Sequence, residues 1–137
     1  MKYKRSNKSN RGQSLVEVAL VLPIILMILL GLLDFGRAYF TLVALHDAAD
    51  EGATYAAIRP SDVAGIQRRA AEASTRLVPI QQANVSVVYP PIITVGAPIT
   101  VTIDYFLDLY TPFVQAMLPD GELILMGSAT QPIITVR

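Results

Sequence analysis

Few residues of this chain could do chemistry. It contains one histidine and no cysteine, so it offers no thiol nucleophile and no cysteine-based metal site. His46 and Asp50 are spaced i, i+4, which would place them on one face of a helix as metal ligands often are. One histidine with carboxylates still lacks the ligand set of a zinc site, and exposure on or just beyond a strand explains Asp104 and Asp108. We therefore expect no catalytic site, no metal and no cofactor.

The charges of the chain are unevenly distributed although its formal net charge is zero and 53% of its residues are hydrophobic. No acid precedes Glu17, whereas five basic residues do: Lys2, Lys4, Arg5, Lys8 and Arg11. Basic residues beside an apolar helix stay on the cytoplasmic side. The basic head therefore predicts topology rather than nucleic-acid binding, with the N-terminus inside the cell and everything after about Tyr39 outside.

The segment Leu15–Leu33 is almost wholly apolar and is long enough to cross a membrane. From Glu17 to Asp34 a helix would rise about 25 Å, close to the hydrocarbon thickness of about 30 Å. Pro23 removes one helical hydrogen bond and predicts a kink, which membrane helices tolerate. No small-x-small cleavage site follows the apolar run, so the segment is predicted to stay in the membrane rather than to be a signal peptide.

Four residues beyond the apolar run are typical of a membrane exit, with charges at headgroup depth and aromatic rings beside them. They are Asp34, Phe35, Arg37 and Tyr39.

Gly12, Gln13 and Glu17 carry a second signal, because a carboxylate inside an apolar run is costly. In one interpretation Glu17 snorkels to the inner interface. In the other, a prepilin peptidase cuts after Gly12, so that Gln13 becomes the first residue and Glu17 the fifth. The ammonium created at Gln13 could then be neutralised by Glu17 of the same or an adjacent helix.

With these motifs the chain resembles the TadE/TadF-like pseudopilins of the tight-adherence (Tad, or Flp) pilus system. The resemblance is carried by the segments Gly12–Glu17, Ala19–Pro23, Asp34–Arg37 and Ala48–Ala53, with a weaker likeness at Val101–Phe106 and Thr111-Pro112. Val18 departs from the family, which usually has an aromatic residue after the glutamate. The resemblance implies cleavage by a prepilin peptidase and a role in assembling or decorating an adhesive pilus, with other pilins, pseudopilins and the Tad assembly platform as partners.

Small residues recur at every fourth position after the membrane exit, at Ala44, Ala48, Gly52 and Ala56. Such a stripe lets another backbone approach closely. It would pack either on the protein's own sheet or on a neighbouring pilin helix.

The remaining pattern predicts a second helix and a small sheet. Arg59-Pro60 ends the long helix, Ser61 is the expected N-cap of an amphipathic helix from Asp62 to Leu77, and Pro79 stops it. The expected strands are Val85–Tyr89, Ile99–Tyr105 and Ile133–Val136, the last of them with a possible forerunner at Glu122–Met126. Between them, residues 111–118 form an apolar turn or short helix, interpreted either as a lid on the core or as a patch that contacts membrane or a partner.

The sequence thus predicts an α+β protein: a long N-terminal transmembrane helix that continues into an exported pilin-like domain with a second amphipathic helix and an antiparallel sheet of three or four strands. The expected parts are a basic prepilin leader over 1–12, a transmembrane helix over 13–38 and the extracytoplasmic domain over 39–137. The expected function is that of a minor pilin-like subunit of a Tad-type pilus, binding neither nucleic acid nor a small-molecule substrate. The alternative is an uncleaved, signal-anchored envelope protein whose outer domain binds another envelope component.

Overall fold

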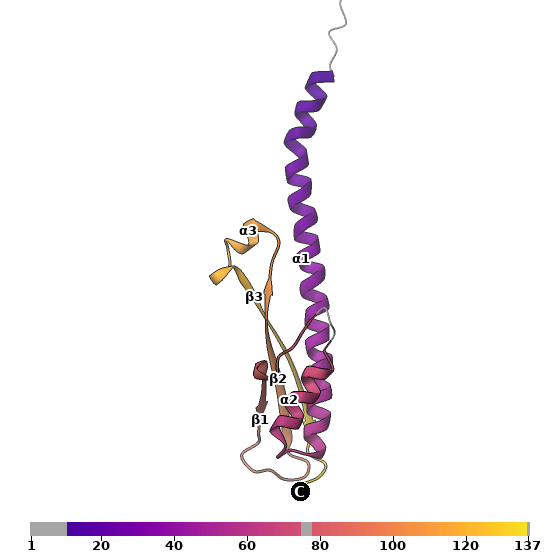
Figure 1. Ribbon diagram of the computed structural model, residues 1–137, viewed down its shortest axis with the longest axis vertical. Coiled ribbons are helices and arrows are strands. Elements are labelled where there is room, and N and C mark those ends of the chain that lie inside the picture. The colour runs from indigo at the N-terminus through magenta and orange to yellow at the C-terminus, as the bar shows by residue number, and fades with distance from the viewer. Residues whose placement is uncertain (1–10, 75–77, 137) are drawn as a thin grey trace, which may run out of the picture.

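The computed structural model describes residues 11–74 and 78–136. They form one long helix with a small sheet and a shorter helix along its second half, and another short helix beside its middle (Figure 1). The elements are α1 (Arg11–Ile58), α2 (Val63–Glu72), the 3₁₀ turn η1 (Gln82–Asn84), β1 (Val85–Val88), β2 (Pro98–Asp108), α3 (Pro112–Gln115), the 3₁₀ turn η2 (Pro119–Gly121) and β3 (Glu122–Pro132). The expected α+β class is confirmed, with three antiparallel strands. The basic head, residues 1–10, lies outside the described residues.

Helix α1 has 48 residues and continues through Pro23, which at about 1.5 Å per residue makes it about 72 Å long. Its first half is apolar and almost wholly exposed, and it is long and apolar enough to cross a membrane. Its second half carries the rest of the fold (Figure 1). The helix ends at Ile58 because Arg59 precedes Pro60, and a residue before proline is disfavoured in the α conformation.

The small residues of the second half of α1 form its packing face. Ala48, Ala53 and Ala56 have no exposed surface, and Gly52 is buried as well. A Cβ on Gly52 would lie 3.0 Å from the Cβ of Ala70 in α2 and 3.2 Å from Cγ1 of Val101 in β2. The stripe predicted from the sequence therefore packs on the protein's own sheet and second helix.

The sheet is a meander with the order β1-β2-β3, and every neighbouring pair is antiparallel. Ile99, Val101 and Ile103 of the central strand are fully buried against α1, as their alternation predicted. Strand β3 approaches α1 closely at Gly127, where a Cβ would lie only 2.5 Å from the carbonyl carbon of Leu45.

Two helix boundaries differ from the sequence expectation. The N-cap of α2 is Asp62 rather than Ser61, because the Asp62 carboxylate accepts a hydrogen bond of 2.9 Å from the N–H of Gly65. The helix ends at Glu72, well before the expected end at Leu77, which lies outside the described residues.

The expected strand Ile133–Val136 is wrong. The third strand is Glu122–Pro132, which begins where the expected forerunner did. Beyond it, the N–H of Ile134 donates to the carbonyl of Ala57 at 2.7 Å, and the N–H of Thr135 donates to the same oxygen at 3.3 Å. The last carbonyls of a helix lack partners within the helix, so Ile134 and Thr135 cap α1. Ile133 instead exchanges backbone hydrogen bonds with Gly96 and Ala97, just before β2.

The interpretation of residues 111–118 as a lid on the core is also wrong. No residue of α3 is buried, and the exposed fractions of Phe113 and Met117 are 62% and 72%. Only Thr111, which precedes α3, is buried. The alternative, a patch that contacts membrane or a partner, remains.

Candidate functional site

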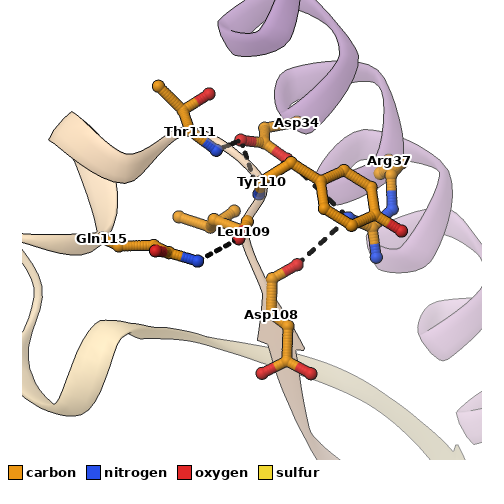
Figure 2. A network of polar contacts seen from close by, with 7 residues as sticks. All are labelled: Asp34, Arg37, Asp108, Leu109, Tyr110, Thr111 and Gln115. Carbon is orange, nitrogen blue, oxygen red and sulfur yellow. Dashed lines mark hydrogen bonds and ion pairs between the residues drawn. The ribbon is translucent and has the colours of Figure 1, made fainter.

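Asp34 joins the apolar half of α1 to the sheet. It is the first charged residue after the apolar run, yet only 5% of its surface is exposed. Figure 2 shows its carboxylate directed at the chain that leaves the end of β2. A carboxylate this deeply buried is normally paired with a positive charge or well hydrogen-bonded.

The partners of Asp34 are backbone N–H groups. Oδ1 accepts from the N–H of Tyr110 at 2.9 Å, and Oδ2 accepts from the N–H of Thr111 at 2.8 Å. Both donors lie beyond the last paired residue of β2, so no strand partner is available to them. One carboxylate therefore fixes the loop that leads into α3.

Arg37 completes the contact from the next turn of α1. Its Nη1 lies 3.7 Å from Oδ1 of Asp34 and donates to the carbonyl of Asp108 at 3.0 Å. The guanidinium carbon lies 4.1 Å from the centre of the Tyr110 ring, within cation–π range. Asp34 and Arg37 with residues 108–111 are called the clasp below. Gln115 supports it by donating from Nε2 to the carbonyl of Leu109.

Sequence reasoning singled out Asp34 and Arg37 as membrane-exit residues but missed their partners. These lie more than 70 positions away along the chain. They are backbone groups, which almost every residue has, so the sequence does not distinguish them. An acid directly after an apolar run was the available signal, and it was interpreted only as a membrane boundary.

The surroundings of the clasp are apolar. A groove of about 510 Å³ runs beside it, and the lining residues are Leu32, Leu33, Gly36, Arg37, Phe40, Thr41, Val78, Tyr105 and Leu107. Phe35 and Tyr39, the two aromatic residues expected at a membrane exit, do not contribute to the clasp and are 70% and 65% exposed. The clasp thus sits where the apolar helix meets the folded domain.

Gly12, Gln13 and Glu17 lie far from the clasp, on the first turns of α1, where all three are exposed. The helix separates Glu17 from Asp34 by about 25 Å at its usual rise. The structure therefore does not bring the two acids that bracket the apolar run together.

His46 and Asp50 contact different partners on β3. Nδ1 of His46 lies 3.2 Å from the carbonyl of Ser128, and Asp50 accepts a hydrogen bond of 3.0 Å from Gln131. In the described part of the chain, no three residues among His, Cys, Asp and Glu are grouped so that they could hold a metal ion. Both side chains thus fasten β3 to α1.

A second polar contact closes the far end of α1. The hydroxyl of Tyr55 donates to Oδ2 of Asp62 at 2.8 Å, while the N–H of Gly65 donates to the other oxygen. These hydrogen bonds, that from Tyr55 first, lower the pKa of Asp62. Nearby, the hydroxyl of Tyr89 donates to the carbonyl of Pro60 at 2.8 Å, and burial raises the pKa of Tyr89.

The fold and the clasp define a class of protein: a small α+β domain built on the second half of one helix whose first half could cross a membrane. Comparison with known families narrows this class. The model of the family described as TadE-like protein matches residues 12–54, so this segment of the chain is TadE-like. The match begins at Gly12 and includes Glu17, the apolar run and Asp34.

That family is structural and pilus-associated, and the match links this segment to the Tad pilus system. The comparison with curated proteins gave no match, and the comparison with solved structures gave none.

Proposed function

We propose that this protein is a minor pilin-like structural and assembly subunit of a Tad-type (Flp) pilus that supports pilus biogenesis and surface adhesion. The observation that carries the proposal is that the TadE-like match and the exposed apolar half of α1 coincide, with the folded domain on the same helix. A subunit of this shape can leave the membrane with its domain attached, because one helix serves as both the span and the core of the domain.

The span of this proposal covers residues 13–38 and the extracytoplasmic domain covers 39–137. The helix holds its apolar side chains exposed over its first half, and lipid or neighbouring apolar helices would remove them from water. The basic head before Arg11 favours a cytoplasmic N-terminus. Asp34 and Arg37 then lie at the outer edge of the membrane.

A prepilin peptidase is the proposed processing partner, acting between Gly12 and Gln13 on a leader of residues 1–12. Supporting this, Gly12 is exposed on the first turn of α1, and no atom outside that turn lies within 4 Å of where its Cβ would be. The other proposed partners are pilins or pseudopilins, the Tad assembly platform and membrane lipid.

The mature N-terminus tests the processing step. Mass spectrometry of protein purified from membranes should find Gln13 as the first residue. The Gly12→Leu variant should keep its leader, because the subsite before the cut has no room for a bulky side chain. Recovery of the intact leader from cells with a working peptidase would support the alternative, an uncleaved envelope protein.

The role of Glu17 tests assembly separately from processing. Glu17→Ala should leave cleavage and membrane insertion unchanged and reduce piliation and copurification with partner pilins, because the ammonium of Gln13 loses its counter-charge. Val18→Ala, one position away and also exposed, is the matched control. Normal piliation of the Glu17→Ala variant would leave the carboxylate as an interfacial charge only.

A further inference from the structure

The end of the sheet that carries α3 is rich in exposed apolar side chains. Figure 1 shows α3 at one end of the β2–β3 hairpin, and this end lies alongside the apolar half of α1. The C-terminus lies at the opposite end of the sheet. No charged residue occurs from Leu109 to Pro119. Phe113 and Met117 are among the most exposed apolar side chains of the domain, at 62% and 72%.

The clasp fixes the level of α3 along the helix. Thr111, the residue before α3, donates its N–H to Asp34 at 2.8 Å. Asp34 directly follows Leu33, the last residue of the apolar run. The hairpin end is therefore held at the height at which the apolar half of α1 ends.

The exposed aromatic residues gather at the same height. In the described part of the chain, six aromatic side chains are exposed, and all belong to the segments 35–40 and 106–113 that the clasp ties together: Phe35, Tyr39, Phe40, Phe106, Tyr110 and Phe113. Tyrosine rings are enriched at the level of lipid headgroups because they combine an apolar body with a polar hydroxyl, and the phenylalanine rings add exposed apolar surface at the same height.

The outward face of the sheet changes its character along its length. At the far end the cross-strand pairs are Thr100 with Thr130 and Thr102 with Ser128, which carry hydroxyl groups. Towards α3 the pair of Phe106 with Ile124 is apolar, and both side chains are more than half exposed. The last pair, Asp108 with Glu122, is acidic and exposed. Carboxylates belong at headgroup depth or in water, so they limit how deep the hairpin end could go.

From this geometry we infer that α3 and the residues around it enter the outer leaflet of the bilayer as a second, shallow contact beside the span. The inference rests on the proposed membrane span. Phe113 and Met117 contact the upper acyl chains, while Asp108 and Glu122 stay among the headgroups. The domain thereby touches the membrane at two places and has a fixed orientation to it before it is extracted into a pilus.

Tryptophan fluorescence can test this contact, because the chain contains no native tryptophan. Three single-tryptophan variants of the full chain are placed in phosphatidylcholine vesicles with lipids brominated at shallow or deep acyl positions. Phe113→Trp probes α3. Leu26→Trp probes the span, and Ile92→Trp probes the loop between β1 and β2 at the far end, where Ile92 is 72% exposed.

The expected result is that Phe113→Trp is blue-shifted and quenched more strongly by shallow than by deep bromines, that Leu26→Trp is quenched most by deep bromines, and that Ile92→Trp is not quenched. Adding Met117→Glu to Phe113→Trp should reduce quenching, whereas adding Thr130→Glu on the polar part of the sheet should not.

The outcomes separate the two hypotheses. If Leu26→Trp is not quenched, the proposed span fails. If Leu26→Trp is quenched and Phe113→Trp behaves like Ile92→Trp, the span holds and the contact of α3 with lipid is overturned, which leaves α3 exposed for a protein partner.

Discussion

At the scale of single residues, Asp34 differs from the other acids of the chain because its carboxylate is buried and bonded to backbone N–H groups. Removing it leaves two donors without an acceptor in apolar surroundings. Arg37 is more exposed and touches the loop through one carbonyl and one ring. The two members of the ion pair should therefore contribute unequally.

We predict that Asp34→Ala destabilises the docked hairpin end by about 3 kcal/mol, the scale of charged hydrogen bonds whose donors are left unpaired. Arg37→Ala should cost about 1 kcal/mol, and the double variant should cost less than the sum, since the two residues share partners. Amide hydrogen exchange at Tyr110 and Thr111 in detergent micelles measures each value. Strict additivity would contradict the clasp and leave two independent charges at a membrane boundary.

The second residue-scale prediction concerns acid. The pKa of Asp62 is lowered from its ordinary value of 3.8 by the hydrogen bonds from Tyr55 and Gly65. A lowered pKa in the folded state contributes stability above the unfolded value, and this stability is lost as the pH falls through the folded value. The midpoint temperature of thermal unfolding should therefore decrease as the pH drops below about 4. The decrease should be smaller in Asp62→Asn. An equal decline in both proteins would show that other carboxylates cause it.

At the scale of elements, the contact between α1 and β3 depends on Gly127. Its missing side chain allows β3 to pass directly over the backbone of Leu45. We predict that Gly127→Ala costs about 1–3 kcal/mol in unfolding free energy, the usual range for overpacking. Gly36→Ala is the matched control, because a Cβ there meets nothing within 4 Å and alanine favours a helix. Denaturant unfolding of the two variants measures the difference, and equal stabilities would contradict the close approach.

The elements also show what could be predicted from the sequence. The alternation of Ile99, Val101 and Ile103 and the four-residue spacing of small residues in α1 each predict burial on one face, and both sets of residues are buried in the structure. Periodicity fails where backbone groups decide the outcome. Ile134 looks like part of a strand but donates to Ala57 at the end of α1, and the apolar residues around Phe113 look like core although they are exposed.

The candidate site was predictable only in part for the same reason. The positions of Asp34 and Arg37 were visible, since charges after an apolar run stand out. Their partners, the N–H groups of Tyr110 and Thr111 and the carbonyl of Asp108, are identical in chemistry to those of any other residue. Only the antiparallel return of β2 towards the apolar half of α1 brings them to the helix.

At the scale of the whole molecule, one helix serves two environments, and the clasp lies where they meet. The second half of α1 supplies the core residue Leu45 and the alanine-rich packing face, called the alanine face, on which the sheet packs. Residues 39–137 therefore retain that core without the span. They lack Asp34 and Arg37, however, so the hairpin end loses its attachment.

The last prediction separates the stability of the core from that of the attachment between the hairpin end and Asp34. In a fragment of residues 39–137, the amides of Ile99–Ile103 should remain protected from hydrogen exchange, because their strand partners and the alanine face are present. The amides of Tyr110 and Thr111 should exchange about a hundredfold faster than in a fragment of residues 33–137, the factor that corresponds to about 3 kcal/mol. Asp34→Ala in the longer fragment should reproduce the faster exchange while keeping the same helix length. If residues 110 and 111 stay protected in the shorter fragment, the hairpin end is held by the sheet alone. In that case the level of α3 relative to the span is not set by Asp34.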